Sequence, residues 1–184
     1  MGLIGLTGQT AMITGAARGL GLSFASVVAQ AHANVAVLDV LDAPSQELLD
    51  FRSLSNVEVE YYTCDISVKT QVTDAISRVE QEFARIDINV NAAGVVTDSS
   101  FIETSEETLK RTFAINFNVS FLVAQACATS MINRIKASAD TVPVDPAVQG
   151  GSIIFIASIS IHIPSVSQNI SAYMRLQSCG MRAS

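Results

Sequence analysis

Apolar residues in this chain fall into short continuous runs that alternate with longer stretches in which they recur at helical spacing. The runs are typical of strands buried on both faces, and the spaced stretches are typical of helices that cover them. This alternation predicts an α/β fold with a doubly wound parallel sheet between two layers of helices. The expected strands are Ala11–Ile13, Asn34–Val40, Val57–Thr63, the run from Asp87 to its exit turn at Gly94, and Gly151–Ser158.

Four stretches between these runs predict helices. Asp42 is the expected N-cap of a helix that runs to about Leu54, with Pro44 in its first turn. Ser105 is the expected cap of a long helix that reaches about Lys136, followed by a loop over Ala137–Gly150. The helix Leu22–Ala31 has apolar residues at Phe24, Val27, Val28 and Ala31, and Val68–Phe83 carries one apolar stripe of Val72, Ala75, Ile76, Val79 and Phe83.

The first strand runs into the glycine-rich turn Thr14-Gly15-Ala16-Ala17-Arg18-Gly19-Leu20-Gly21, which opens a helix. Gly15 suits a tight turn, Gly19 allows the backbone to approach a pyrophosphate, and Gly21 allows the helix to pack against the strand. The free N–H groups at the start of the helix favour a bound phosphate. The turn therefore predicts a dinucleotide site, and the alternative is a glycine-rich loop without a ligand.

Asp39 lies near the carboxyl end of the second strand, about twenty residues after the glycine turn. A carboxylate at this place accepts hydrogen bonds from adenosine ribose hydroxyls and repels a 2′-phosphate, so it favours NAD over NADP. Arg18 offers a positive charge to a 2′-phosphate and keeps NADP open. A solvated aspartate at a strand end is the other interpretation.

Composition narrows the class of protein. The 184 residues suffice for one domain over 1–184, and the formal charge of −6 argues against nucleic acid or an anionic membrane surface as a partner. Three dispersed cysteines without Cys-x-x-Cys spacing argue against a disulfide framework and a metal site. Polar residues interrupt Phe113–Ile132, and Met1–Gln9 lacks the pattern of a signal peptide. We therefore expect a cytoplasmic protein that acts on a small molecule, without a membrane span.

Six motifs occur in one order: the glycine turn, Asp39, Asn91-Ala92-Ala93-Gly94, Asn116, Ser158 and Ser171-Ala172-Tyr173. Together they resemble the short-chain dehydrogenase/reductase family. The resemblance implies a Rossmann-type fold and an NAD(P)-dependent oxidoreductase that transfers a hydride between nicotinamide C4 and a secondary alcohol or ketone. Tyr173 would then act as the acid/base, Ser158 would polarise the substrate oxygen, and Asn116 would hold a water of the proton relay.

The same resemblance assigns the remaining cofactor contacts and, for the complete family form, a homo-oligomeric assembly. It places Asp65 and Ile66 at the adenine ring, and Leu20 beside the pyrophosphate with the glycines. It also places Asn91, Ala92, Ala93 and Gly94 along the cofactor, and Tyr173 and Gln177 at the nicotinamide ribose. Alternatives stay open for Asp65 as a helix cap and for Asn116 as a hydrogen-bonded core residue. Ser160 is a less suitable partner for Tyr173, His162 is read as a solvated loop residue, and Asn89 puts a polar group where the family has an apolar one.

Two features depart from the family pattern. Gln177 stands where the family has the lysine that lowers the tyrosine pKa, and without that cation only about one tyrosine in a thousand is ionised at pH 7. Its loss costs roughly 10²–10⁴ in rate. Eleven residues follow Tyr173, so about a quarter of a family domain is missing and the fifth strand is expected to be an apolar edge. One hypothesis that accounts for both departures is a misread exon boundary or shifted frame near the tyrosine codon, and the alternative is a truncated, non-catalytic nucleotide-binding relative.

Overall fold

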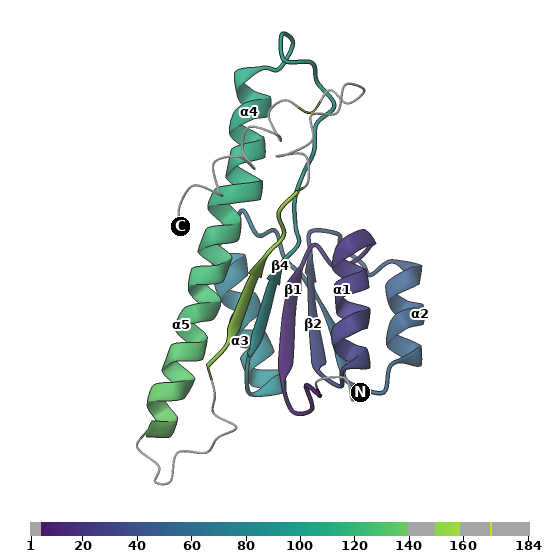
Figure 1. Cartoon of the computed structure of the whole chain (residues 1–184), viewed down its shortest axis with the longest axis vertical. Coiled ribbons are helices and arrows are strands. Elements are labelled where there is room, and N and C mark those ends of the chain that lie inside the picture. The colour runs from purple at the N-terminus through teal and green to yellow at the C-terminus, as the bar shows by residue number, and fades with distance from the viewer. Residues whose placement is uncertain (1–4, 140–149, 159–169, 171–184) are drawn as a thin grey trace.

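A five-stranded parallel sheet forms the centre of the protein, as seen in a computed structural model that describes residues 5–139, 150–158 and 170 (Figure 1). The strand order is β3-β2-β1-β4-β5, and every pairing is parallel. The chain moves outward from β1 to β3 and then crosses back to β4 on the other side of β1, so β1 and β4 flank the point where the order reverses. The strands are β1 (Thr10–Thr14), β2 (Asn34–Asp39), β3 (Val59–Thr63), β4 (Ile88–Asn91) and β5 (Ser152–Phe155).

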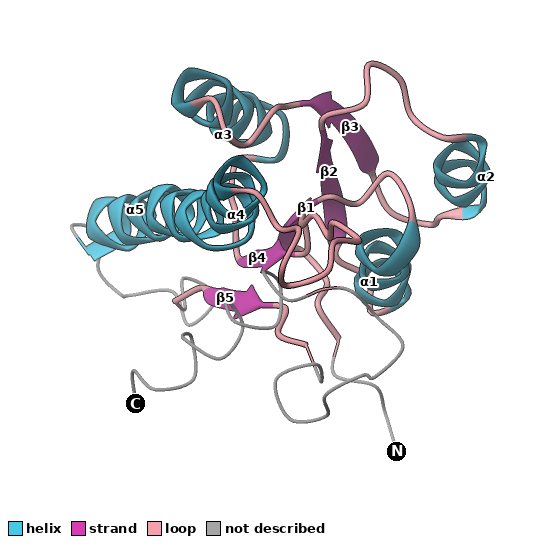
Figure 2. Cartoon of the chain, turned by 90° about the horizontal axis from the view of Figure 1, so that it is seen from above, coloured by secondary structure: helices cyan, strands magenta, loops and turns pink. Residues whose placement is uncertain are grey.

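Helices cover both faces of the sheet and confirm the predicted three-layer α/β architecture (Figure 2). The helices α1 (Gly19–Gln30) and α2 (Gln46–Leu54) lie on one face. The helices α3 (Lys69–Phe83), α4 (Glu106–Phe113) and α5 (Ser120–Ala139) lie on the other. Each face has its own apolar core, centred on Ile13, Val35 and Val37 beneath α1 and on Met12, Ala36 and Leu38 beneath α3 and α5.

The apolar stripe predicted for α3 is confirmed, whereas the face predicted for α1 is only partly right. All five expected residues of α3 are buried. In α1 the buried residues are Gly21, Leu22, Ala25 and Ala29. Of the predicted residues, Phe24 and Val28 are partly buried against the same core, whereas Val27 is 62% exposed. Because α1 is apolar on nearly all sides, spacing alone does not select a face. Its small residues allow the helix to pack closely on β1 and β2, and this close packing decides which face is buried.

Two helix boundaries also differ from expectation. Ser45, rather than Asp42, caps α2, because its hydroxyl oxygen accepts a hydrogen bond from the Leu48 N–H at 3.2 Å. The predicted long helix begins after Ser105 as expected, but a π-helical turn, η1 (Ala114–Val119), separates α4 from α5. The helix continues to Ala139, and residues 140–149 of the predicted loop lie outside the described residues.

By length and composition, the helical stretch Glu106–Ser138 is apolar enough to cross a membrane. The same stretch packs on the sheet, where Val123, Ala124, Cys127 and Met131 are buried in the core beneath α5. Its apolar composition therefore serves the packing of this fold, although about half of each outer side chain at Phe117, Phe121, Leu122 and Ile132 is exposed.

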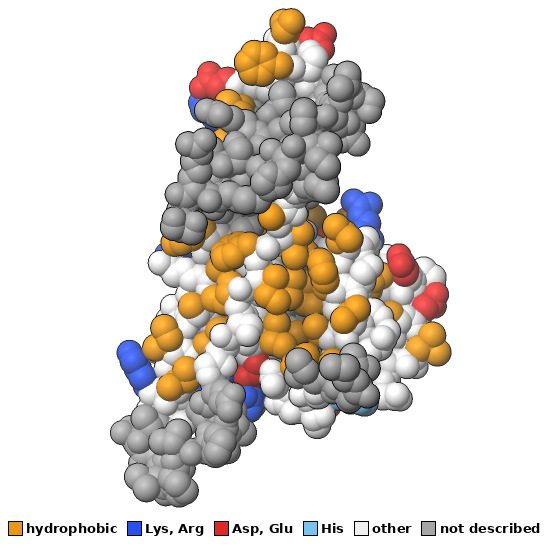
Figure 3. All heavy atoms as spheres, viewed as in Figure 1, with side chains coloured by type: hydrophobic (Ala, Val, Ile, Leu, Met, Phe, Trp, Pro, Cys, Tyr) orange, Lys and Arg blue, Asp and Glu red, His pale blue; other side chains and the backbone are white. Residues whose placement is uncertain are grey.

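The strand β5 is the edge of the described sheet, as predicted, and has β4 as its one neighbour there. Its side chains Ile154 and Phe155 are 44% and 54% exposed. Apolar side chains gather over the strands between α5 and α1 (Figure 3). An exposed apolar edge strand of this kind is a surface for further pairing or packing.

Candidate functional site

The carboxyl ends of the strands carry most of the residues predicted for the site. The glycine turn lies between β1 and α1, and two of its glycines are required by space. A Cβ on Gly15, which has φ of +66°, would lie 2.6 Å from the Ala93 Cα, and one on Gly21 would lie 2.3 Å from the Gly15 carbonyl oxygen. A Cβ on Gly19 would meet nothing within 4 Å, so its backbone is open to a ligand. The turn thus forms a cradle that is tightly packed at Gly15 and Gly21 and open at Gly19.

The amino end of α1 faces this open side without a capping side chain. Arg18 is the N-cap residue and makes no side-chain hydrogen bond to the first turn. The N–H groups of that turn and the positive end of the helix dipole are therefore directed at whatever occupies the cradle. Arg18 and Leu20 are both exposed there.

Asp39 is held against the glycine turn by backbone hydrogen bonds. Its Oδ2 accepts a hydrogen bond from the Ala17 N–H at 3.0 Å, and its Oδ1 accepts one from the Leu41 N–H at 3.3 Å. Ser45, which the sequence analysis missed, donates from its hydroxyl to the Ala17 carbonyl at 2.5 Å. The sequence does carry a signal for Ser45 as a helix cap, because a serine followed by an acidic residue in the first turn, here Glu47, is typical of a helix start.

At the end of β3, Asp65 forms a local turn and does not cap α3. Its Oδ1 accepts hydrogen bonds from the Ser67 N–H at 2.9 Å and the Ser67 hydroxyl at 2.6 Å, whereas Val68 is the N-cap residue. The interpretation of Asp65 as the helix cap is therefore wrong. Ile66 is partly buried against the core beneath α3 and α5, so its side chain also has a packing role.

The exit of β4 closes on the glycine turn from the opposite side. The Ala93 N–H donates to the Thr14 hydroxyl at 3.2 Å, which fixes Ala93 against Gly15. Thr14 begins the glycine turn in the sequence, but this contact was not predicted, because its partner lies 79 residues away. Asn91 begins this exit with Ala92, and Gly94 ends it beside Asn116, whose Oδ1 would lie 3.4 Å from a Cβ on Gly94.

Asn116 lies in the π-helical turn η1 and uses both ends of its amide on one residue. Its Oδ1 accepts from the Val95 N–H, and its Nδ2 donates to the Val95 carbonyl, both at 2.8 Å. Asn116 is thus a hydrogen-bonded residue of the fold, which was one of its two interpretations. Single π turns inside helices often occur at functional sites, and its predicted role in a proton relay stays a prediction.

Ser158 follows β5 at the same edge and is half-buried. Tyr173 and Gln177, together with Ser160 and His162, lie outside the described residues. The described residues therefore include the predicted cofactor contacts other than Tyr173 and Gln177. Of the predicted catalytic residues they include Asn116 and Ser158.

Two weak acids near this edge, the buried thiol of Cys64 and the partly buried phenol of Tyr61, are held in their neutral forms. Burial, with a smaller effect from the Asp65 charge, raises the pKa of the Cys64 thiol to about 11. Burial, with the charges of Asp39 and Asp42, raises the pKa of Tyr61 to about 12. Both groups are protonated at neutral pH, so neither is a nucleophile or a base there.

The glycine cradle, the uncapped start of α1 and the fixed carboxylate of Asp39 fit a nicotinamide dinucleotide. The cradle has no room for side chains at Gly15 and Gly21, and it offers N–H donors for phosphates and a carboxylate for a ribose.

Comparisons with known proteins agree with this arrangement. The chain is 30% identical over 157 residues to zerumbone synthase of Zingiber zerumbet. The matched residues cover 84% of this chain and 53% of that protein. It is 34% identical over 127 residues to D-threitol dehydrogenase of Mycolicibacterium smegmatis, covering 69% and 49% of the two chains.

Solved structures show the same fold. A short-chain type dehydrogenase/reductase from Mycobacterium marinum superimposes with a TM-score of 0.84 at 30% identity, covering 97% of this chain and 67% of that one. The NADPH-dependent 3-quinuclidinone reductase from Rhodotorula rubra superimposes with a TM-score of 0.78 at 26% identity, covering 96% and 62%.

The chain spans about half the length of these curated relatives. Residues 9–173 match the model of the short chain dehydrogenase family. Since this match extends over most of the sequence, the chain belongs to the short chain dehydrogenase family.

Proposed function

We propose that this chain is the cofactor-binding part of an NAD(P)-dependent oxidoreductase that interconverts a secondary alcohol and a ketone. The observation that carries the proposal is the cradle in which Ala93 closes on Gly15 while Asp39 is fixed to the Ala17 amide. A nicotinamide bound there supplies hydride acceptance or donation at C4.

The residues of the chain have the following roles in this proposal. The open backbone at Gly19 and the first turn of α1 bind the pyrophosphate, and Asp39 accepts hydrogen bonds from the ribose hydroxyls. Ser158 donates a hydrogen bond to the substrate oxygen, and Tyr173 gives that oxygen its proton or removes it. Asp65 and the Asn91–Gly94 exit line the adenine and nicotinamide ends.

NAD is the preferred cofactor in this proposal. The Ala17 N–H of the glycine turn and the Leu41 N–H both hold the Asp39 carboxylate in place, so it cannot easily move away from a 2′-phosphate and the like charges would repel. We expect NADH to bind about 100-fold more tightly than NADPH. Fluorescence titration of both cofactors measures this ratio, and Asp39→Ala should reduce it while the exposed Asp42→Ala leaves it unchanged. Equal affinities in the wild-type chain would contradict the assignment.

Catalytic competence depends on position 177. We expect slow turnover with Gln177, and a rise of roughly 10²–10⁴ in kcat for Gln177→Lys, because the cation stabilises tyrosinate. The assay is NADH formation with a panel of small secondary alcohols. If both proteins bind NADH and neither turns over, the non-catalytic nucleotide-binding alternative is favoured.

A homo-oligomer and a cytosolic location complete the proposal. The outer face of α5 is apolar at Phe121, Leu122 and Ile132, and such a face suits a second copy of the chain. Light scattering after size-exclusion chromatography tests the assembly, and Phe121→Glu is expected to yield a smaller species. A wild-type protein that is monomeric at high concentration would refute it.

A further inference from the structure

Two asparagines, Asn89 and Asn91, lie next to each other on one face of β4, a strand that is buried along its whole length. Asn89 is completely buried, and Asn91 is 4% exposed. The residues between and before them, Val90 and Ile88, pack in the core beneath α1, so the two amides face the α5 side. A buried amide is costly unless its hydrogen bonds are made, so the partners of this pair matter.

These partners form a continuous chain across three strands. Asn89 Nδ2 donates to the Met12 carbonyl of β1 at 3.4 Å. Asn89 Oδ1 accepts from Asn91 Nδ2 at 2.7 Å, and the same Nδ2 donates to the Ile154 carbonyl of β5 at 3.4 Å. The bond between the two amides is the shortest of these three side-chain hydrogen bonds, and it connects the longer bonds that reach β1 and β5.

Asn89 also determines how the Asn91 amide is turned. Asn91 Oδ1 is buried and has no hydrogen-bond partner within the described part of the chain, so the orientation depends on Nδ2 alone. A rotated amide would place Asn91 Oδ1 against Asn89 Oδ1, two acceptors without a proton between them. Replacing Asn89 with an apolar residue would leave only the long bond to Ile154 to hold the orientation.

Each of the three linked strands ends in the candidate site. β1 leads to Gly15, β4 leads to Ala93, which lies against Gly15, and β5 leads toward Ser158. Binding sites lose affinity when their parts shift by fractions of an ångström. We propose that Asn89 is a positioning residue: through Asn91 it fixes the positions of the ends of β1, β4 and β5 that face the cofactor. The expected effect of Asn89 on cofactor affinity rests on the proposed function.

The test uses the full chain and the variant Asn89→Leu, which keeps the branched shape and the number of side-chain heavy atoms and removes both polar atoms. Two-dimensional ¹H–¹⁵N spectra report the Asn91 side-chain amide, and fluorescence titration reports the NADH Kd. We expect slow hydrogen exchange of the Asn91 amide in the wild-type protein, fast exchange in Asn89→Leu, and a Kd raised about two- to tenfold, the worth of one hydrogen bond. Ile88→Val, on the other face of β4, is the matched control and should alter neither signal.

A double variant separates positioning from general stability. If Asn89 acts through Asn91, Asn89→Leu should not change the NADH Kd further in an Asn91→Leu background. Additive effects on Kd, or fast exchange of the Asn91 amide in the wild-type chain, would overturn the inference. If the wild-type chain binds no NADH, the proposed function fails, whereas the exchange of the Asn91 amide still decides the role of Asn89.

Discussion

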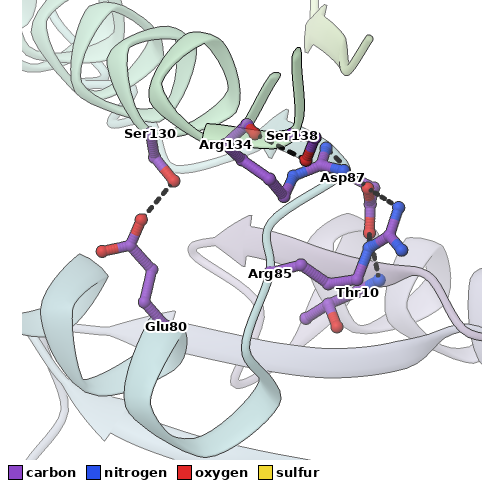
Figure 4. Close-up of polar contacts among 7 residues, drawn as sticks. All are labelled: Thr10, Glu80, Arg85, Asp87, Ser130, Arg134 and Ser138. Carbon is purple, nitrogen blue, oxygen red and sulfur yellow. Dashed lines mark hydrogen bonds and ion pairs between the residues drawn. The ribbon is translucent and has the colours of Figure 1, made fainter. Parts of the chain in front are cut away.

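Removal of the Asp87 carboxylate should destabilise the fold more than any exposed charge does, because Asp87 joins three elements at the end of the sheet opposite the site (Figure 4). Its side chain is 4% exposed and accepts hydrogen bonds from the Thr10 N–H at 3.0 Å and from Arg85 at 2.7 Å. Arg134 of α5 forms an ion pair with it at 2.9 Å. In Figure 4 both guanidinium groups point toward this carboxylate, that of Arg85 from the loop before β4 and that of Arg134 from α5.

The magnitude follows from what Asp87→Ala leaves behind. The Thr10 N–H, on a residue 1% exposed, loses its side-chain acceptor, which costs about 1–3 kcal/mol. Breaking a fully buried ion pair costs about 3–5 kcal/mol. The side chains of Arg85 and Arg134 are 26% and 18% exposed, so solvent offsets part of that cost, mainly at Arg85, because the Nε and Nη2 atoms of Arg134 are buried. We expect a total loss of about 3–5 kcal/mol, which corresponds to a decrease in Tm of about 6–20 °C for a chain of this size.

Urea unfolding followed by far-UV circular dichroism measures this loss. Asp87→Asn keeps an acceptor for Thr10 and should lose less, about 1–3 kcal/mol. Asp74→Ala, on the exposed face of α3, is the control and should remain within about 0.5 kcal/mol of the wild type. The reasoning is refuted if Asp87→Ala is as stable as Asp74→Ala, or if Asp87→Asn and Asp87→Ala lose the same amount.

Three further predictions test the site and the core. Gly15→Ala should abolish NADH binding and destabilise the fold, because its Cβ would lie 2.6 Å from the Ala93 Cα; Gly19→Ala, with φ of +60° and open space, should cost only about 1–2 kcal/mol in urea unfolding. Asn116→Ala should cost about 1–3 kcal/mol and speed hydrogen exchange of the Val95 amide, because both bonds to Val95 disappear; unchanged exchange would contradict this. Burial raises the thiol pKa of Cys64 to about 11 and of Cys127 to about 12, so the folded state keeps these protons while the unfolded chain releases them above about pH 9. The free energy of unfolding should therefore fall by about 1.4 kcal/mol per thiol between pH 8 and pH 10, and Cys127→Ser should show a smaller fall than the wild type.

Local pattern was sufficient for the order of the elements, their type and the buried stripe of α3. Each of these depends on residues close in sequence: alternation of apolar runs, a 3.6-residue period against a polar background, and a serine at the start of a helix. The glycine turn and Asp39 belong to the same class, because spacing alone places them at the ends of adjacent parallel strands.

Tertiary packing decided the rest. The face of α1 had to be selected by fit, since a helix that is apolar on nearly all sides has no dominant stripe. Ser45 replaced Asp42 as the cap of α2 because only Ser45 contacts both the Leu48 amide and the Ala17 carbonyl. The contact of Ala93 with Gly15 and the bond from Asn89 to Met12 join residues 77 or more positions apart, which no local period records. Such pairings depend on the register of β1 against β4, and that register exists only once the sheet has formed.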